Sequence, residues 1–458
     1  MGLLYFLVCV AVIALTAVLL YRKYNPQGVL LLSGLFMVAL AAIVGLHPAD
    51  VAKTTGSGVF DVFRFAEEKF ISNFGRAGLM IMVIGGYVAF MNKIQATNML
   101  VWLAIKPLGF LKKCPYLAAA LAIPIGQLLF ITTPSAAGVG LLLVATLYPI
   151  LVNLGVSKMT ALTVISAATL FDQGPGSANT AAASSLVGLS PVEYFLKFQM
   201  PNVIPTTVIL MLVFFFYNRW CDRRDLAAGK QIYSTERVDE ADRPDVPGIF
   251  ALLPLVPILL LVFFSEYVGI FHVELSTTVA MLVSFLISLV FVAIHRRSVK
   301  EIFPLFGTFW QGMGNVFASV ITLIVAAEIF SGGLISLGFI DNLVAGTTGI
   351  GLGGVSISIV ITAVVFFAAM LMGSGNAAFF SFGPLVPDIA AQIGMPAVQM
   401  ILPMQLAASM GRATSPIAGV MVAICGVAGV SPMDLAKRNT PPLIIGVIAL
   451  TLIHFILV

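Results

Sequence analysis

The sequence GSGNAA, residues 373–378, interrupts an apolar region that extends from about 353 to 430. A second interruption, GRATSP, lies at residues 411–416 of the same region. Exposed backbone amides are costly in hydrocarbon, so irregular backbone at depth survives only where protein or trapped water satisfies it. We therefore expect a re-entrant hairpin at about 353–391 and a broken helix at about 397–430.

A similar series of interruptions occurs in the first half of the chain. Residues 132–137 read TTPSAA and residues 172–180 read DQGPGSANT, within an apolar region from about 115 to 187. The order and spacing of these breaks match those of the second half across about 60 residues, with a shift of about 240 positions. We interpret the match as an internal repeat, with a second hairpin at about 115–152 and a second broken helix at about 158–187.

The composition of the chain requires a lipid environment. Of 458 residues, 60% are hydrophobic and only 10% are charged, whereas a soluble domain is about 25% charged. The other apolar runs are long enough to cross about 30 Å of hydrocarbon, and they lie at about 3–21, 28–46, 77–92, 201–217, 249–265, 274–294, 314–337 and 441–458. With one crossing from each interrupted region, they predict an all-α polytopic membrane protein with about ten transmembrane helices and two re-entrant hairpins.

The distribution of lysine and arginine predicts the orientation, because these residues are enriched in cytoplasmic loops. The long charged segment 218–247 is interpreted as a cytoplasmic linker between two repeats, 1–217 and 248–458. Both termini then lie outside, and each repeat contains five crossings. An odd number of crossings inverts the second repeat relative to the first. Inverted repeats with broken helices are common in secondary transporters, whose substrate site lies near the midplane at the repeat interface.

The four breaks carry the polar residues that we expect to bind the solute. Folded toward one another, they would gather small hydroxyl and amide side chains into one polar centre. The start of each half-helix would add free N–H groups and a partial positive charge, which suit a carboxylate. The candidate substrate-binding residues are Ser135, Ser177, Asn179, Ser374, Gly375, Asn376, Arg412, Thr414 and Ser415.

Arg412 lies far from either end of its predicted crossing. An arginine at the centre of a transmembrane helix costs roughly 2.5–3.5 kcal/mol on insertion scales. This cost is reasonable if Arg412 neutralises a bound carboxylate. The alternatives are a buried pair with Asp172 or Glu328, or a side chain that reaches the cytoplasmic interface.

Asp172 and Glu328 are the candidates for binding a coupling ion, Na+ or H+. Asp172 flanks the first-half break, and Glu328 lies within the apolar run 314–337. Acidic residues inside a membrane are rare and often mark ion or proton pathways. The structural alternatives are that Asp172 caps a helix or pairs with Arg412, and that Glu328 forms hydrogen bonds at a domain interface.

Several other classes of function have no support in the sequence. It contains no Walker loop, no H-E-x-x-H and no G-x-S-x-G motif, and its four cysteines are far apart with no C-x-x-C pair. We therefore expect no cofactor, no metal site and no enzymatic activity. The small net charge of +4 argues against a nucleic-acid partner. The missing nucleotide motif favours a secondary transporter over a primary one.

Four short motifs of the second half are distinctive, namely GSGNA at 373–377, FFSF at 379–382, GR at 411–412 and SP at 415–416. They resemble the anaerobic C4-dicarboxylate carrier family of the DcuC type. The resemblance implies a carrier of succinate, fumarate, malate and related dianions in a bacterial inner membrane, with both termini periplasmic. It also implies the plan of the wider ion-transporter superfamily, a homodimer with a scaffold domain and a transport domain that moves as an elevator.

We predict from these observations a secondary transporter that exchanges C4-dicarboxylates or exports succinate. Its partners would be the lipid bilayer and a small organic dianion. One alternative is the same fold carrying another organic anion or an amino acid with Na+ or H+ coupling, or exchanging sodium. Another is a channel or an intramembrane enzyme, although the predicted spans offer no convincing nucleophile–base pair.

Overall fold

The computed structural model describes residues 2–46, 51–233, 238–265, 273, 275–297, 299–349 and 353–457. Within these residues all regular secondary structure is helical. Nine helices of this part are long and apolar enough to cross a membrane, or ten if the pair Leu79–Lys93 and Ala96–Phe110, bent by 73°, counts as one span. The prediction of an all-helical membrane protein with about ten spans is confirmed.

The described residues of the first half form eleven α-helices. They are α1 (Gly2–Tyr21), α2 (Pro26–Ile43), α3 (Gly58–Asn73), α4 (Leu79–Lys93), α5 (Ala96–Ile105), α6 (Pro115–Thr132), α7 (Ala136–Asn153), α8 (Lys158–Ala167), α9 (Ala178–Leu186), α10 (Pro191–Tyr194) and α11 (Met200–Ala227). A π-helical segment, Phe74–Gly78, joins α3 to α4, and a 3-10 segment, Lys106–Phe110, extends α5.

The second half contains another eleven. They are α12 (Val256–Phe263), α13 (Thr277–Arg296), α14 (Phe303–Val316), α15 (Thr322–Ser336), α16 (Phe339–Gly349), α17 (Gly354–Met372), α18 (Gly375–Phe382), α19 (Val386–Gln392), α20 (Ala397–Arg412), α21 (Gly419–Ala428) and α22 (Pro432–Leu457). A π-helical segment, Phe317–Ile321, joins α14 to α15, and a 3-10 segment, Gly383–Leu385, joins α18 to α19.

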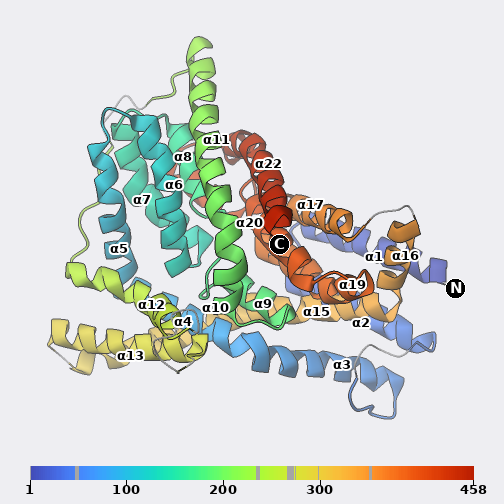
Figure 1. The fold of residues 1–458 in the computed structure, drawn as a ribbon. Coiled ribbons are helices and arrows are strands. Elements are labelled where there is room, and N and C mark those ends of the chain that lie inside the picture. The colour runs from blue at the N-terminus through green and yellow to red at the C-terminus, as the bar shows by residue number, and fades with distance from the viewer. Residues whose placement is uncertain are drawn as a thin grey trace.

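The helices run in two main directions (Figure 1). Helices α5, α6, α7, α8 and α11 stand upright in this view, whereas α2, α3, α13 and α15 lie across its lower part. Helix α15 contacts α18, α4 contacts α9, and α9 contacts α18, so helices from both halves of the chain meet around the broken segments. The polar residues of the breaks are therefore placed inside the protein and away from lipid.

Glycines permit the closest helix pairs. A Cβ atom at Gly34 of α2 would lie 2.6 Å from the backbone nitrogen of Phe330 in α15. A Cβ at Gly312 of α14 would lie 2.7 Å from the carbonyl oxygen of Gly85 in α4. In a membrane, where lipid is as apolar as the side chains, such small residues let backbones approach and gain packing energy. These pairs hold the helices that surround the breaks.

Three segments differ in extent from their predicted bounds. The span predicted at 201–217 belongs to a longer helical run, Pro191–Ala227. The first part of the predicted linker 218–247 is therefore helical, because its charged residues continue α11 without a helix breaker. The predicted span 249–265 is a shorter apolar helix, Gly248–Phe263. Residues 234–237 of the linker lie outside the described residues.

Candidate functional site

Helices α7 and α18 of the site each begin at a capping serine. Ser135 precedes α7, and its Oγ accepts a hydrogen bond from the Gly138 amide at 3.3 Å. Ser374 precedes α18, and its Oγ accepts from the Ala377 amide at 3.2 Å. Both residues have the extended backbone of an N-cap. The predicted interruptions near 132–138 and 373–377 are thus present, and each exposes the positive end of a helix.

Each of these starts packs against the break in its own half. Gly375 lies so close to α20 that a Cβ atom there would be 2.9 Å from the carbonyl oxygen of Ala408. Gly174 has a left-handed backbone, with φ +94°, and a Cβ there would be 2.8 Å from Ile131 Cγ2 at the end of α6. The glycines near the breaks therefore serve close approach, which brings helix starts and broken segments together.

Asp172 organises the first-half break, between α8 and α9. Its Oδ1 accepts a hydrogen bond from Ser177 Oγ, and its Oδ2 accepts from Asn179 Nδ2 at 3.1 Å. Ser177 Oγ in turn accepts from the amides of Asn179 and Thr180, so Ser177 caps α9. All these side chains are buried. Both carboxylate oxygens of Asp172 are therefore engaged by its own segment.

Hydrogen bonds between described residues join the two halves of the chain at this centre. Asn179 Nδ2 donates to Asn376 Oδ1 at 3.2 Å, which links the first break to the start of α18. Gln405 Nε2 donates to the backbone oxygen of Asp172 at 3.0 Å. Arg412 Nη2 donates to the backbone oxygen of Thr169 at 2.6 Å. The structure thus brings Asp172, Asn179, Asn376 and Arg412 into one connected region.

A buried amide cluster in this region was missed from the sequence. Gln405 Oε1 accepts hydrogen bonds from Tyr194 OH at 3.0 Å and from Gln199 Nε2 at 3.3 Å. Gln199 Oε1 accepts from the Gly174 amide at 3.1 Å, which fixes the first break. Glutamines at 199 and 405 stand inside or beside apolar runs. An isolated amide in such a run is a signal that could have indicated the cluster.

Arg412 ends α20 and opens the second-half break. Its side chain is only 9% exposed, so it does not reach the interface, and it forms no salt bridge with Asp172, Glu328 or any other described residue. The end of α20 is held against α17, since a Cβ atom at Gly411 would lie 2.2 Å from the carbonyl oxygen of Phe366. Arg412 is therefore a fixed, buried cation with no salt bridge to a described residue, and the Asp172 carboxylate acts on it only from beyond salt-bridge distance.

Several buried polar atoms near the breaks lack hydrogen-bond partners among the described residues. They are Arg412 Nε, Ser415 Oγ, Asn179 Oδ1 and Thr133 Oγ1. Thr414 differs, because its Oγ1 donates to the Gly411 carbonyl at 2.7 Å. Leaving a buried polar group unsatisfied costs about 1–3 kcal/mol, and each such group calls for an explanation. Unused donors on Arg412 and Ser415 fit a site that is completed by a bound anion.

Glu328 lies apart from the hydrogen-bonded centre. It is on α15, half-buried, and forms no hydrogen bond or ion pair with the residues that the structure describes. It lines a small cavity with Asn73, Ala182 and Phe380 and also a larger one of about 500 Å³. The structure thus separates the two acids, one satisfied at the break and one facing open space.

A second buried charge cluster also lay outside the predicted site. Arg438 of α22 forms a salt bridge with Asp222 of α11 and donates to Thr160 Oγ1 at 2.9 Å. Asp222 accepts further hydrogen bonds from Ser157 and Tyr116, each at 2.9 Å. Arg438 adjoins Lys437 just before the predicted span 441–458, a position typical of a basic loop, but its side chain is only 7% exposed. This cluster ties α11 to α22 and is fully compensated, unlike Arg412.

The family of the chain follows from comparison with known proteins. A family model described as DcuC, C4-dicarboxylate anaerobic carrier, matches residues 1–458. The chain belongs to the DcuC family. The anaerobic C4-dicarboxylate transporter DcuC of Escherichia coli K12 is 30% identical over 445 residues, which cover 96% of this chain and 94% of that protein. The probable DcuC transporter of Vibrio cholerae is 30% identical over 440 residues, 95% and 94% of the two chains.

Two solved structures share the fold of this DcuC-family chain. Neisseria gonorrhoeae MtrF, described as illuminating a class of antimetabolite efflux pumps, has a TM-score of 0.63 and 11% identity, covering 94% of this chain and 95% of MtrF. The Alcanivorax borkumensis YdaH transporter has a TM-score of 0.60 and 12% identity, covering 94% and 98%. At such identities the likeness concerns the fold alone. The DcuC relatives are transporters, and this chain has their multi-pass helical architecture.

Proposed function

We propose that this DcuC-family chain is a secondary transporter of C4-dicarboxylates such as succinate, fumarate and malate. The observation that carries the proposal is Arg412, a buried cation with no salt bridge to a described residue and an unused Nε donor. An arginine fork matches a carboxylate in geometry as well as charge. The names of the DcuC relatives indicate which carboxylates to test.

The geometry supports one carboxylate at each side of the centre. Arg412 and Ser415 would bind the first carboxylate with the donors that they leave unused. The second would meet the N–H groups at the starts of α18 and α7, near Gly375, Asn376 and Ser135, where the helix dipoles favour negative charge. Ser177, Asn179 and Thr414 would act mainly by shaping the breaks, since their hydroxyl or amide hydrogens are already donated within the protein.

We also propose an inverted repeat, with hairpins at 115–152 and 353–391 that belong to a moving transport domain. The order of elements in the two halves supports it. In each half, a long helix with a central π segment precedes a helix break, with Phe74–Gly78 in the first half and Phe317–Ile321 in the second. A further π segment, Phe195–Gln199, follows the break of the first half and has no counterpart among the described residues of the second. The scaffold would then contain α2, α4, α14 and α15, the tightly packed pairs. Elevator movement of the hairpins and broken helices past this scaffold would give alternating access.

The coupling ion in this proposal, Na+ or H+, binds at Glu328 rather than at Asp172. Asp172 has both carboxylate oxygens engaged by Ser177 and Asn179, whereas Glu328 makes no hydrogen bond with the described residues and faces two cavities.

The proposal further includes a homodimer in the bacterial inner membrane and exchange or efflux of succinate. Both termini would lie in the periplasm, because the excess of basic residues in the opposite loops favours that orientation.

Flux of labelled succinate into proteoliposomes tests the proposed function. Arg412→Ala is expected to lower the rate at subsaturating succinate by at least about 30-fold, because truncating one partner of a buried charge pair costs roughly 2–5 kcal/mol. Arg22→Ala removes an exposed arginine at the end of α1 and should leave flux unchanged.

Competition experiments complete the test. Unlabelled fumarate and malate should compete with succinate, and amino acids should not. Wild-type protein that transports no dicarboxylate would end the proposal, and normal flux in Arg412→Ala would remove the arginine from the site. Strong competition by an amino acid would favour the alternative cargo.

A further inference from the structure

Two cavities lie at the ends of the helices that start at the candidate site. Helix α7 begins after Ser135 and ends at Asn153, beside a cavity of about 940 Å³ that we call the linker cavity. The helices that begin after Ser374 end at Gln392, beside a cavity of about 500 Å³ that we call the α15 cavity. Each half of the chain therefore has one cavity where the second arm of its predicted hairpin ends.

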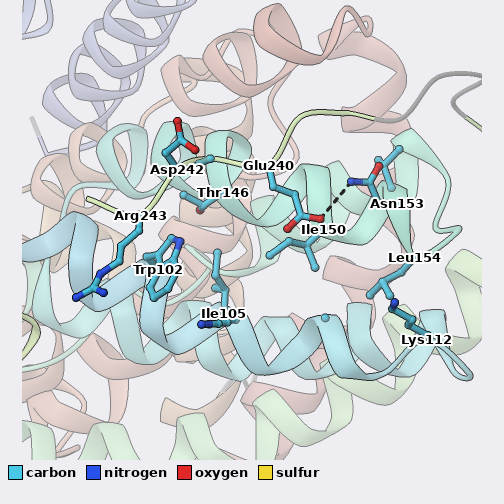
Figure 2. A pocket seen from close by; sticks show the side chains of 14 residues that line it. Trp102, Ile105, Lys112, Thr146, Ile150, Asn153, Leu154, Glu240, Asp242 and Arg243 are labelled. Carbon is cyan, nitrogen blue, oxygen red and sulfur yellow. Dashed lines mark hydrogen bonds between the residues drawn. The ribbon is translucent and has the colours of Figure 1, made fainter. Parts of the chain in front are cut away.

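The linker cavity has a basic side that is not neutralised. Three cations line it, Lys106, Lys112 and Arg243, and none forms a salt bridge with a described residue. Figure 2 shows Arg243 and Lys112 at opposite ends, with Trp102 between them. Lys106 Nζ lies 4.6 Å from the Trp102 ring centroid. Lys106 and Lys112 thus lie on the side of the cavity that follows α5, whereas Arg243 lies on the linker, next to Asp242.

The linker forms the opposite wall of this cavity. Asn153 at the end of α7 donates from Nδ2 to the Val238 oxygen at 2.9 Å and accepts from the Val238 amide at 3.1 Å. It also donates to Glu240 Oε1 at 3.4 Å (Figure 2). Glu240 and Asp242 add two negative charges. With three cations and two anions among its lining residues, the linker cavity has a net charge of +1.

The α15 cavity has the opposite balance. Its charged lining residues are Glu328, Asp341, Asp388 and Lys69, which give a net charge of −2. Asp341 Oδ1 accepts a hydrogen bond from Gln392 Nε2 at 2.7 Å, and Lys69 Nζ lies 5.2 Å from the Phe65 ring centroid. The two cavities therefore differ by three charges although they occupy equivalent places in the two halves.

We propose that the linker cavity is a recruiting site for the transported dianion, and that the α15 cavity disfavours the same dianion at the other mouth. The inference rests on the proposed function. A net charge in a cleft with low-dielectric walls raises the local concentration and association rate of an oppositely charged solute. A dianion feels the difference between the cavities twice as strongly as a monoanion does. The carrier is therefore loaded more readily from the linker side, which is the cytoplasmic side in the predicted topology.

Counterflow of labelled succinate in membrane vesicles of opposite orientation tests this inference. Inside-out vesicles report loading from the linker side, and right-side-out vesicles report the other side. In the triple variant Lys106→Gln, Lys112→Gln and Arg243→Gln, the KM should rise about fivefold in inside-out vesicles only, with the maximal rate unchanged. Added salt should weaken the effect in wild-type protein, because it screens the cavity charges. Lys113→Gln, next to Lys112 but outside the cavity lining, is the matched control and should not change KM.

A reverse variant separates recruitment from a structural role. Glu240→Gln with Asp242→Asn makes the linker cavity more positive, so it should lower the KM in inside-out vesicles, whereas damage to the fold would raise it. Asp341→Asn with Asp388→Asn should lower the KM in right-side-out vesicles only. Equal changes in both orientations, or none, would overturn the recruiting site while leaving the proposed function intact. If wild-type vesicles showed no dicarboxylate counterflow, both the recruiting site and the proposed function would be ruled out.

Discussion

The two helix breaks differ in how their polar groups are satisfied. In the break before α9, the carboxylate of Asp172 accepts hydrogen bonds from Ser177 and Asn179, so the segment closes on itself. In the break after α20, Arg412 Nε and Ser415 Oγ have no partner among the described residues. The difference teaches that an interrupted helix can be either a structural element or a binding element. The first break shapes the centre, and the second retains unused donors for an anion.

Asp172→Ala is expected to have the largest effect on stability. It leaves the Ser177 hydroxyl and one of the two Asn179 amide hydrogens without an acceptor, and each buried unsatisfied group costs about 1–3 kcal/mol. We expect the free energy of unfolding to fall by about 2–4 kcal/mol. Thermal unfolding of the purified protein in detergent would measure the loss.

Arg412→Ala is the matched comparison for that measurement. Since Arg412 forms no salt bridge with a described residue, its removal mainly takes one donor from the Thr169 carbonyl. It should lower the free energy of unfolding by about 1–2 kcal/mol, less than Asp172→Ala does, while transport is lost. If Arg412→Ala were the more destabilising of the two, the second break would be the structural one, and the comparison would be reversed.

The breaks themselves could be predicted from the sequence, but their division of roles could not. Small and polar residues inside apolar runs indicate where helices end, which is a local property of the chain. The partners of Asp172, Gln405 and Arg412 depend on how helices from different halves are rotated and packed. The clearest case is Arg438, which a sequence pattern places in a basic loop and the fold buries against Asp222. Local composition indicates where a helix is interrupted, but only the packing of the helices decides which buried charges are paired.

Gly411→Ala should have an intermediate effect, and it tests whether Arg412 must be held in place. The new Cβ would overlap the Phe366 carbonyl oxygen, which it would approach to 2.2 Å. Because that neighbour is backbone, α20 must shift, and overpacking of this kind costs about 1–3 kcal/mol. We expect a lower melting temperature and a higher KM for succinate.

The control for this shift lies at the other end of the same break. A Cβ atom at Gly419 would meet nothing within 4 Å, so Gly419→Ala should change neither the melting temperature nor the KM. Equal behaviour of the two alanine variants would show that the contact between α20 and α17 does not position Arg412.

Ser415→Ala is expected to have the smallest effect and to sharpen the comparison most directly. Its Oγ has no partner among the described residues, so the variant should lose no stability. If the hydroxyl donates to a bound carboxylate, the KM for succinate should rise about tenfold, since a hydrogen bond to a charged group contributes about 1.5–3 kcal/mol at most. Ser177→Ala, at the other break, should lower the stability and leave the KM for succinate unchanged, because it removes a helix cap that contributes about 1 kcal/mol. Stability loss in Ser415→Ala together with an unchanged KM would mean that this hydroxyl serves the fold, and that the unused donors of the second break do not mark the substrate.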